Sequence, residues 1–161
     1  MTSKWLRRTM VLAACASAAL LTACGSSTVD SAVTPTRIVS FGDALSDVGY
    51  AGKRYTINDG STNIWAQQFA ASYGRTLETS SAGGAGYARG NARLALTPDA
   101  AGVAGTLTVT RQIDAFLAAG SIGSNDMVLI NSGISDIISQ MAAVKAGTIT
   151  EATAVTNAQT A

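Results

Sequence analysis

Residues 41–49, FGDALSDVG, have the composition of a strand end followed by a turn at which chemistry could take place. If a helix begins directly after the Gly42-Asp43 pair, residue 44 stands at its N-terminus. There the backbone N–H groups and the helix dipole stabilise negative charge. In an ester hydrolase the residue at this position would be the serine nucleophile. Here it is Ala44, which has no oxygen with which to attack.

Two later segments contain residue types that assist such chemistry. Residues 86–94, GYARGNARL, contain two glycines, and residues 130–138, INSGISDII, follow the end of an apolar run. Together with residues 41–49 they resemble the first three sequence blocks of the GDSL, or SGNH, hydrolase family, in order and at similar spacing. The resemblance covers residues 37–161. It implies an α/β protein with a flavodoxin-like α/β/α fold of three layers around a parallel sheet, and lipase or esterase activity.

The resemblance also implies a role for each matching position. Asn91, or Gly90 if the alignment shifts by one residue, would offer its N–H to an oxyanion. Ser135 stands where the family has an asparagine that donates its amide, while Asp43 and Asp136 would support their motifs. The family's Asp-x-x-His block, which supplies the base and its orienting acid near the C-terminus, has no counterpart in this sequence.

These differences predict an impaired carboxylic-ester hydrolase. Removing the nucleophile of such a triad costs about 10⁶-fold in turnover, and losing one oxyanion donor costs on the order of 10²- to 10³-fold. Three altered positions favour a natural, divergent branch of the family over an engineered knockout. The alternatives are a non-catalytic module for acyl or glycan ligands, an esterase whose full-length form supplies catalytic groups beyond Ala161, and a truncated chain that does not fold because a sheet edge stays unpaired.

Several neighbouring polar residues have a structural interpretation. Ser46 lies two residues after Ala44, about 200° round a helix, so we expect its hydroxyl to satisfy the first helical turn rather than to attack. Asp43 and Asp47 are expected to be helix-terminus and turn residues.

The glycine-rich segment permits further interpretations. Arg89 and Arg93, with Tyr87, would form a solvated face, or else line a groove that binds an anionic ligand or a glycan. Within residues 83–90 three glycines have the spacing G-x-G-x-x-x-G, one residue longer than the G-x-G-x-x-G fingerprint of dinucleotide-binding proteins. No buried strand precedes them, as that motif requires, so a loop is expected. Histidine is absent and no free cysteine would remain after lipidation, so we expect no metal site and no cofactor.

The hydrophobic pattern predicts the elements that position these residues. We expect strands at 37–41 and 126–133, the second buried on both faces, and a possible short strand at 55–57. Helices are expected from residue 61 or 63 to 73, at 110–119 and at 136–146, with another from Thr150 that is still running at Ala161. Trp65, Phe69 and Leu117 are expected to face the core. Alternating strands and helices indicate an α/β sandwich, incomplete at its C-terminus.

The N-terminus resembles a bacterial lipoprotein signal. Lys4, Arg7 and Arg8 precede an apolar run at residues 10–21, and the sequence LTAC ends at Cys24. We expect residues 1–23 to be a signal peptide, residues 24–36 a lipid-anchored tether and residues 37–161 the domain. Lipid on Cys24 would attach the protein to a membrane of the bacterial envelope, on the periplasmic side or at the outer membrane.

Cleavage before Cys24 would also change the net charge of the protein. The mature chain would carry eight Lys and Arg against ten Asp and Glu, a net charge of minus two. This mildly acidic balance gives no electrostatic basis for binding nucleic acid.

Overall fold

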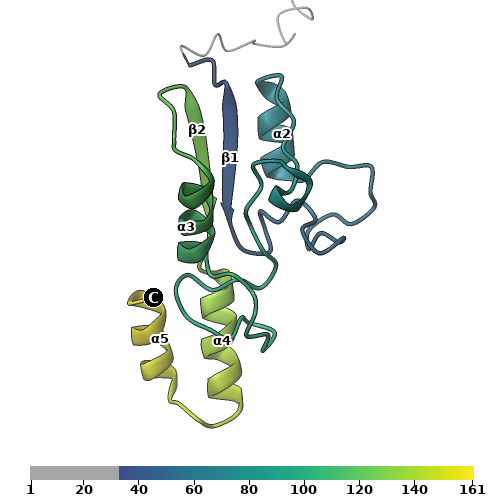
Figure 1. Cartoon of the computed structure of the whole chain (residues 1–161). Coiled ribbons are helices and arrows are strands. Elements are labelled where there is room, and N and C mark those ends of the chain that lie inside the picture. The colour runs from purple at the N-terminus through teal and green to yellow at the C-terminus, as the bar shows by residue number, and fades with distance from the viewer. Residues whose placement is uncertain (1–32) are drawn as a thin grey trace, which may run out of the picture. The chain divides into compact units, whose positions relative to one another are not determined.

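A computed structural model describes residues 33–161. The predicted signal peptide, Cys24 and most of the predicted tether lie outside the described residues. No helix within residues 33–161 is long and apolar enough to cross a bilayer. The elements, in chain order, are β1 (Arg37–Gly42), α2 (Trp65–Ser72), the 3₁₀ helix η2 (Ser80–Ala82), α3 (Val109–Ala119), β2 (Asp126–Asn131), α4 (Ile134–Lys145) and α5 (Glu151–Gln159) (Figure 1).

The two strands form a parallel sheet. Its register runs from Arg37 opposite Asp126 to Gly42 opposite Asn131. Parallel strands need a long crossover connection, and α2 and α3 both lie in the connection between β1 and β2. The predicted α/β class and parallel sheet are therefore confirmed.

The glycine-rich segment lies along the other edge of β1. The Ser40 N–H donates to the Ala85 carbonyl at 3.0 Å, and the Tyr87 N–H donates to the Ser40 carbonyl at 2.7 Å. A parallel bridge joins Ser40 to Gly86. The predicted loop is confirmed, since residues 83–90 form no helix or strand. Part of its backbone is nevertheless paired with β1 instead of with water.

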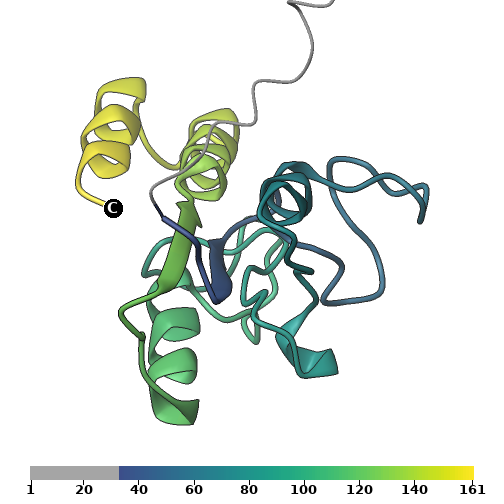
Figure 2. The same cartoon turned by 90° about the horizontal axis from the view of Figure 1, so that it is seen from above.

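Helices cover β1 on both faces (Figure 2). Successive side chains of a strand point to opposite faces. Ile38 packs with Ile64, Ala66, Ala70 and Leu77 from α2 and its flanking segments. Val39 and Phe41 pack with Val109 and Phe116 of α3.

Several details of the sequence prediction are wrong. β2 is only half-buried, and its Ile130 is 57% exposed, because within the described residues β2 pairs with β1 alone. Trp65 and Leu117 are exposed, since the inward stripe of α2 is formed by its alanines and that of α3 by Gln112 and Phe116. Residues 55–57 form no strand, and α5 ends at Gln159.

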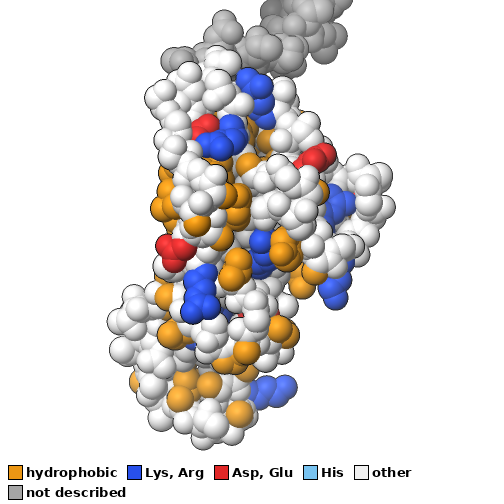
Figure 3. Space-filling model, viewed as in Figure 1, with side chains coloured by type: hydrophobic (Ala, Val, Ile, Leu, Met, Phe, Trp, Pro, Cys, Tyr) orange, Lys and Arg blue, Asp and Glu red, His pale blue; other side chains and the backbone are white. Residues whose placement is uncertain are grey.

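α4 presents an uncovered apolar stripe. Helix α5 packs against α4, but the side chains at Ile134, Ile137, Ile138 and Met141 remain exposed. These positions follow helical spacing and therefore share one side of α4. Figure 3 shows apolar side chains at the surface of the region formed by α4 and α5.

Candidate functional site

The three segments singled out in the sequence meet at the carboxyl ends of β1 and β2. The Asp43 N–H donates to the Asn131 carbonyl at 3.2 Å, which joins the first segment to the third. The Arg89 N–H donates to the Gly42 carbonyl at 3.1 Å, which joins the second segment to the first. In open α/β sheets, ligands bind outside the carboxyl ends of the strands.

Ala44 lies in a turn and not at a helix N-terminus. Residues 44–46 form the turn, and the next helix along the chain is α2. The predicted strand-to-helix elbow is therefore wrong. Ser46 has no first helical turn to satisfy, and its buried Oγ has no hydrogen-bond partner among the described residues.

Asp47 explains why the chain leaves the turn as a loop. Its Oδ1 accepts from the N–H groups of Gly49 at 2.8 Å and Tyr50 at 2.7 Å, an Asx-type arrangement that competes with a helix. Its Oδ2 accepts from the Gly90 N–H at 2.7 Å. The fully buried carboxylate thus fixes the first segment to the second, and the prediction that Asp47 is a turn residue is confirmed.

The two candidates for the oxyanion position differ in their availability. The Gly90 N–H is occupied by Asp47. Asn91 has a positive φ of 62°, the left-handed geometry that asparagine tolerates better than most residues. The Asn91 N–H and the Ala44 N–H donate to no acceptor among residues 33–161. Of the two candidates, Asn91 is the one with a free donor.

The third segment begins α4 and is tied to the second by an ion pair. Ser135 and Asp136 are both buried in the first turn of α4. Asp136 accepts from Arg93 Nε at 3.1 Å and from the Leu94 N–H at 2.8 Å. Arg93 is therefore a structural partner of Asp136, and the prediction that it lies on a solvated face is wrong.

Arg89 is also buried, although the sequence predicts a solvated face for it. Its guanidinium donates to the carbonyls of Tyr87 and Ala88 and to Ser80 Oγ. The Tyr50 ring covers it, with the ring centroid 3.2 Å from Cζ. Burial lowers the pKa of Arg89, and the group nevertheless stays charged near neutrality.

Asp43 is fully buried at the end of β1. Its Oδ1 accepts from the Leu45 N–H at 3.1 Å, as expected of a turn residue, while Oδ2 has no hydrogen-bond partner among the described residues. Burial raises the pKa of this carboxyl, and the charge of Asp136 adds to the effect. The N–H groups of Leu45 and Ile134 offset only part of it.

Sequence reasoning missed Gln112. This fully buried side chain of α3 bonds to both backbone groups of Gly42, directly before the turn. The signal was present, because Gln112 occupies an inward position of the stripe formed by Val109 and Phe116. A polar residue at such a position needs a partner.

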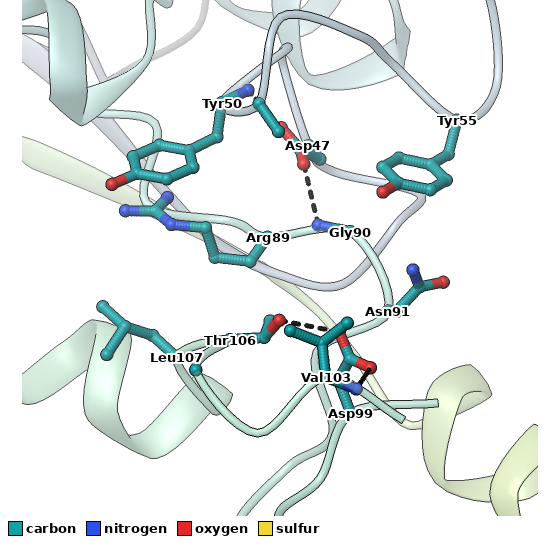
Figure 4. Close-up of a pocket in the computed structure, with 12 residues that line it drawn as sticks. Asp47, Tyr50, Tyr55, Arg89, Gly90, Asn91, Asp99, Val103, Thr106 and Leu107 are labelled. Carbon is teal, nitrogen blue, oxygen red and sulfur yellow. Dashed lines mark hydrogen bonds between the residues drawn. The ribbon is translucent and has the colours of Figure 1, made fainter. Parts of the chain in front are cut away.

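A cavity of 370 Å³ opens beside this junction (Figure 4). Its lining includes Tyr50, Tyr55, Arg89, Asn91, Asp99 and Leu107, but neither Ala44 nor Ser135. The residues that the sequence analysis singled out therefore form two groups. Ala44 and Ser135 lie at the strand ends, whereas Arg89, Gly90 and Asn91 line the cavity.

Comparison of the sequence and the structure with protein-family models, curated proteins and solved structures found no match. Among residues 33–161, no group of three or more His, Cys, Asp or Glu side chains is placed to hold a metal ion.

Proposed function

We propose that this domain is a member of the GDSL/SGNH lipase/esterase family that lacks the serine nucleophile. In this proposal the domain binds carboxylic-ester or acyl ligands at the carboxyl ends of β1 and β2. The convergence of the three segments at that edge carries the proposal. It rests on the bonds from Asp43 to Asn131 and from Arg89 to Gly42. The finer assignment, a flavodoxin-like three-layer fold, is part of the same proposal.

Free backbone donors support an ester-binding role. An oxyanion hole needs N–H groups that are fixed in place and not already bonded. The N–H groups of Ala44 and Asn91 meet the second condition within the described residues. For Asn91 the first condition is met by the neighbouring bond from the Gly90 N–H to Asp47 and by the left-handed backbone. For Ala44 it is met by the bond from the Ser46 N–H to the Asp43 carbonyl, which closes the turn. A carbonyl or a tetrahedral anion would accept from these donors.

The absence of an oxygen at Ala44 favours binding over turnover. Without the nucleophile, such a site retains only binding and oxyanion assistance, about 10⁶-fold below the complete triad. The Ser46 hydroxyl is buried, and its backbone N–H is bonded to the Asp43 carbonyl. It is therefore a poor replacement nucleophile.

A titration with a tetrahedral anion tests this role. A short-chain alkyl phosphonate, added to the ¹⁵N-labelled full chain, should shift the amide resonances of Ala44 and Asn91 saturably, while that of Ala154 on α5 stays in place. The protein should hydrolyse p-nitrophenyl butyrate no faster than its heat-denatured form. Unmoved amides, or turnover that a serine-directed fluorophosphonate abolishes, would contradict the proposal.

We also propose that the protein is an envelope lipoprotein, anchored to a membrane through lipid on Cys24. The support is the LTAC sequence at residues 21–24 after a basic and apolar leader. More than one acyl chain makes anchoring stable, whereas a single chain is marginal. Cells fed an alkyne-tagged fatty acid should label the protein, and Cys24→Ser should remove the label and release the protein from the membrane fraction.

A further inference from the structure

We propose that the 370 Å³ cavity binds a neutral hexopyranose unit of a glycan. One wall is formed by the loop of residues 47–55, the opposite wall by residues 99–107, and the floor by residues 89–91 (Figure 4). The volume is within the range of small-molecule sites. This site borders the proposed ester site, because Asn91 belongs to both, but it is not the same site, because Ala44 does not line the cavity.

The charges around the cavity are already partnered. Asp47 accepts from three backbone N–H groups, and Asp99 accepts from the N–H groups of Ala101 and Val103 and from Thr106 Oγ1. Two carboxylates and the Arg89 guanidinium give the lining a formal charge of minus one. Anionic ligands are therefore disfavoured, and Arg89 disfavours cations near the floor.

The unused polar groups are mostly acceptors. A carboxylate has about four lone-pair sites, so Asp47 and Asp99 can each accept about one more hydrogen bond. The side-chain amide of Asn91 and the hydroxyl of Tyr55 bond to no group among the described residues. A ligand that matches this lining must bring O–H donors without bringing charge, as a sugar ring does.

The aromatic rings supply the apolar part of such a site. Tyr50 and Tyr55 line the same wall and are 41% and 42% exposed. The C–H face of a pyranose packs on an aromatic ring, while its hydroxyls point to the polar rim. Arg89 lies against Tyr50, and the Gly90 backbone lies against Tyr55, so each ring has one side left for a ligand. Tyr55 is the better platform because its hydroxyl bonds to no group among the described residues.

Gly90 allows the Tyr55 ring to lie close to the backbone of residues 89–91. A Cβ at Gly90 would lie 2.0 Å from the Tyr55 ring, so only glycine lets the ring rest on the backbone here. Gly90→Ala should displace Tyr55 without removing any group that contacts the ligand.

Calorimetric titration of the full chain tests the proposal. The probes are trisaccharides of glucose, mannose, galactose and N-acetylglucosamine, with hexanoate and spermidine as charged comparisons. The detergent must lack a sugar head group, which would compete. We expect one neutral trisaccharide to bind at a 1:1 ratio, and neither charged probe to bind.

Variants locate the binding. Tyr55→Ala and Asn91→Gly should each weaken it about tenfold or more, while Tyr55→Phe, which keeps the ring, should stay within about threefold. Leu117→Ala, an exposed change on α3, is the matched control and should bind as the unchanged protein does. Circular dichroism should show the same fold in all variants.

Three results would overturn the proposal. They are the absence of binding by all four trisaccharides, tighter binding of hexanoate or spermidine, and binding that is unchanged by Tyr55→Ala and Gly90→Ala. The phosphonate titration distinguishes failure of the glycan site from failure of the ester site through the Ala44 amide alone, because Asn91 lines the cavity and Ala44 does not.

Discussion

The side chain of Gln112 bonds to both backbone groups of Gly42. Its Oε1 accepts from the Gly42 N–H at 2.9 Å, and its Nε2 donates to the Gly42 carbonyl at 2.9 Å. Gln112 thus supplies an acceptor for the Gly42 N–H and shares the Gly42 carbonyl with the Arg89 N–H at the last residue of β1. Helix α3 therefore fixes the backbone from which the turn at Ala44 departs.

Gln112→Leu should destabilise the protein by about 2–3 kcal/mol, because the buried Gly42 N–H would lose the partner that it has within residues 33–161 and would stay desolvated without a hydrogen bond. Urea unfolding followed by circular dichroism measures the change. Gln68→Ala, at an exposed position of α2, is the control and should change stability by less than about 0.5 kcal/mol. Equal stability of the two variants would show that the Gly42 pairing is dispensable.

Gly42→Ala should destabilise the protein more than a Gly→Ala change at the end of a helix. A Cβ at Gly42 would lie 2.1 Å from the Asn131 carbonyl oxygen, and the φ of +147° disfavours an L residue. We expect a loss of about 3 kcal/mol or more. Gly120→Ala is the control, because its backbone is extended and nothing lies within 4 Å. If Gly42→Ala unfolds at the same urea concentration as Gly120→Ala, the close approach to Asn131 is not present in solution.

Asp136→Ala should separate the second segment from the third. It removes the acceptor of Arg93 Nε and of the Leu94 N–H and leaves the guanidinium without its buried partner. Breaking one side of a buried pair costs about 3–5 kcal/mol. Asp114→Ala, on the exposed side of α3, should have little effect in the same urea assay. A loss below about 1 kcal/mol would mean that the pair contributes no more than a surface salt bridge.

Asp43 should make the protein less stable as the pH rises. Burial raises its pKa above the ordinary 3.8, so the folded state favours the neutral carboxyl. The corresponding stability is fully present below about pH 3.8 and is lost as the pH rises through the folded pKa. Asp43→Asn should therefore become increasingly more stable than the unchanged protein above that pH, and the difference should then level off.

Carboxyl NMR titration provides the direct measurement. Asp43 should titrate above 3.8, while Asp59, whose pKa the hydroxyl and N–H of Thr62 and the N–H of Ser61 lower to about 2, provides an internal comparison. A stability difference between Asp43→Asn and the unchanged protein that does not vary with pH would contradict the assignment.

Local sequence patterns predicted most of the elements. The run from Arg37 to Phe41 and the apolar residues 126–131 form the expected strands, and α3, α4 and α5 begin within two residues of their predicted starts. Periodicity along one segment, however, does not reveal what covers it. It therefore predicted full burial for β2 and a core position for Trp65, whose indole N–H instead donates to the Leu45 carbonyl.

The site could be predicted only in part. The positions of the three segments in the chain followed from residue types, whereas the left-handed backbone at Asn91 was found only in the structure. The burial of Arg89 and the partial burial of Arg93 did not follow from residue types, because the Tyr50 ring that covers Arg89 and the Asp136 carboxylate that pairs with Arg93 come from segments distant in sequence. The loop after Ala44 was missed since Asp47 favours either a helix N-terminus or an Asx turn, and only its bond to Gly90 decides between them.

The parallel register of the sheet affects when the protein can fold. Arg37 lies opposite Asp126, 89 residues later in the chain, so β1 acquires its strand partner only when that residue has been made. At about 5–20 residues per second, synthesis of the intervening chain takes roughly 4–18 s. Closing so long a loop also slows folding. During that interval the edge of β1 that faces β2 stays unpaired, so the nascent chain has time to meet a chaperone or a translocation channel before its sheet closes.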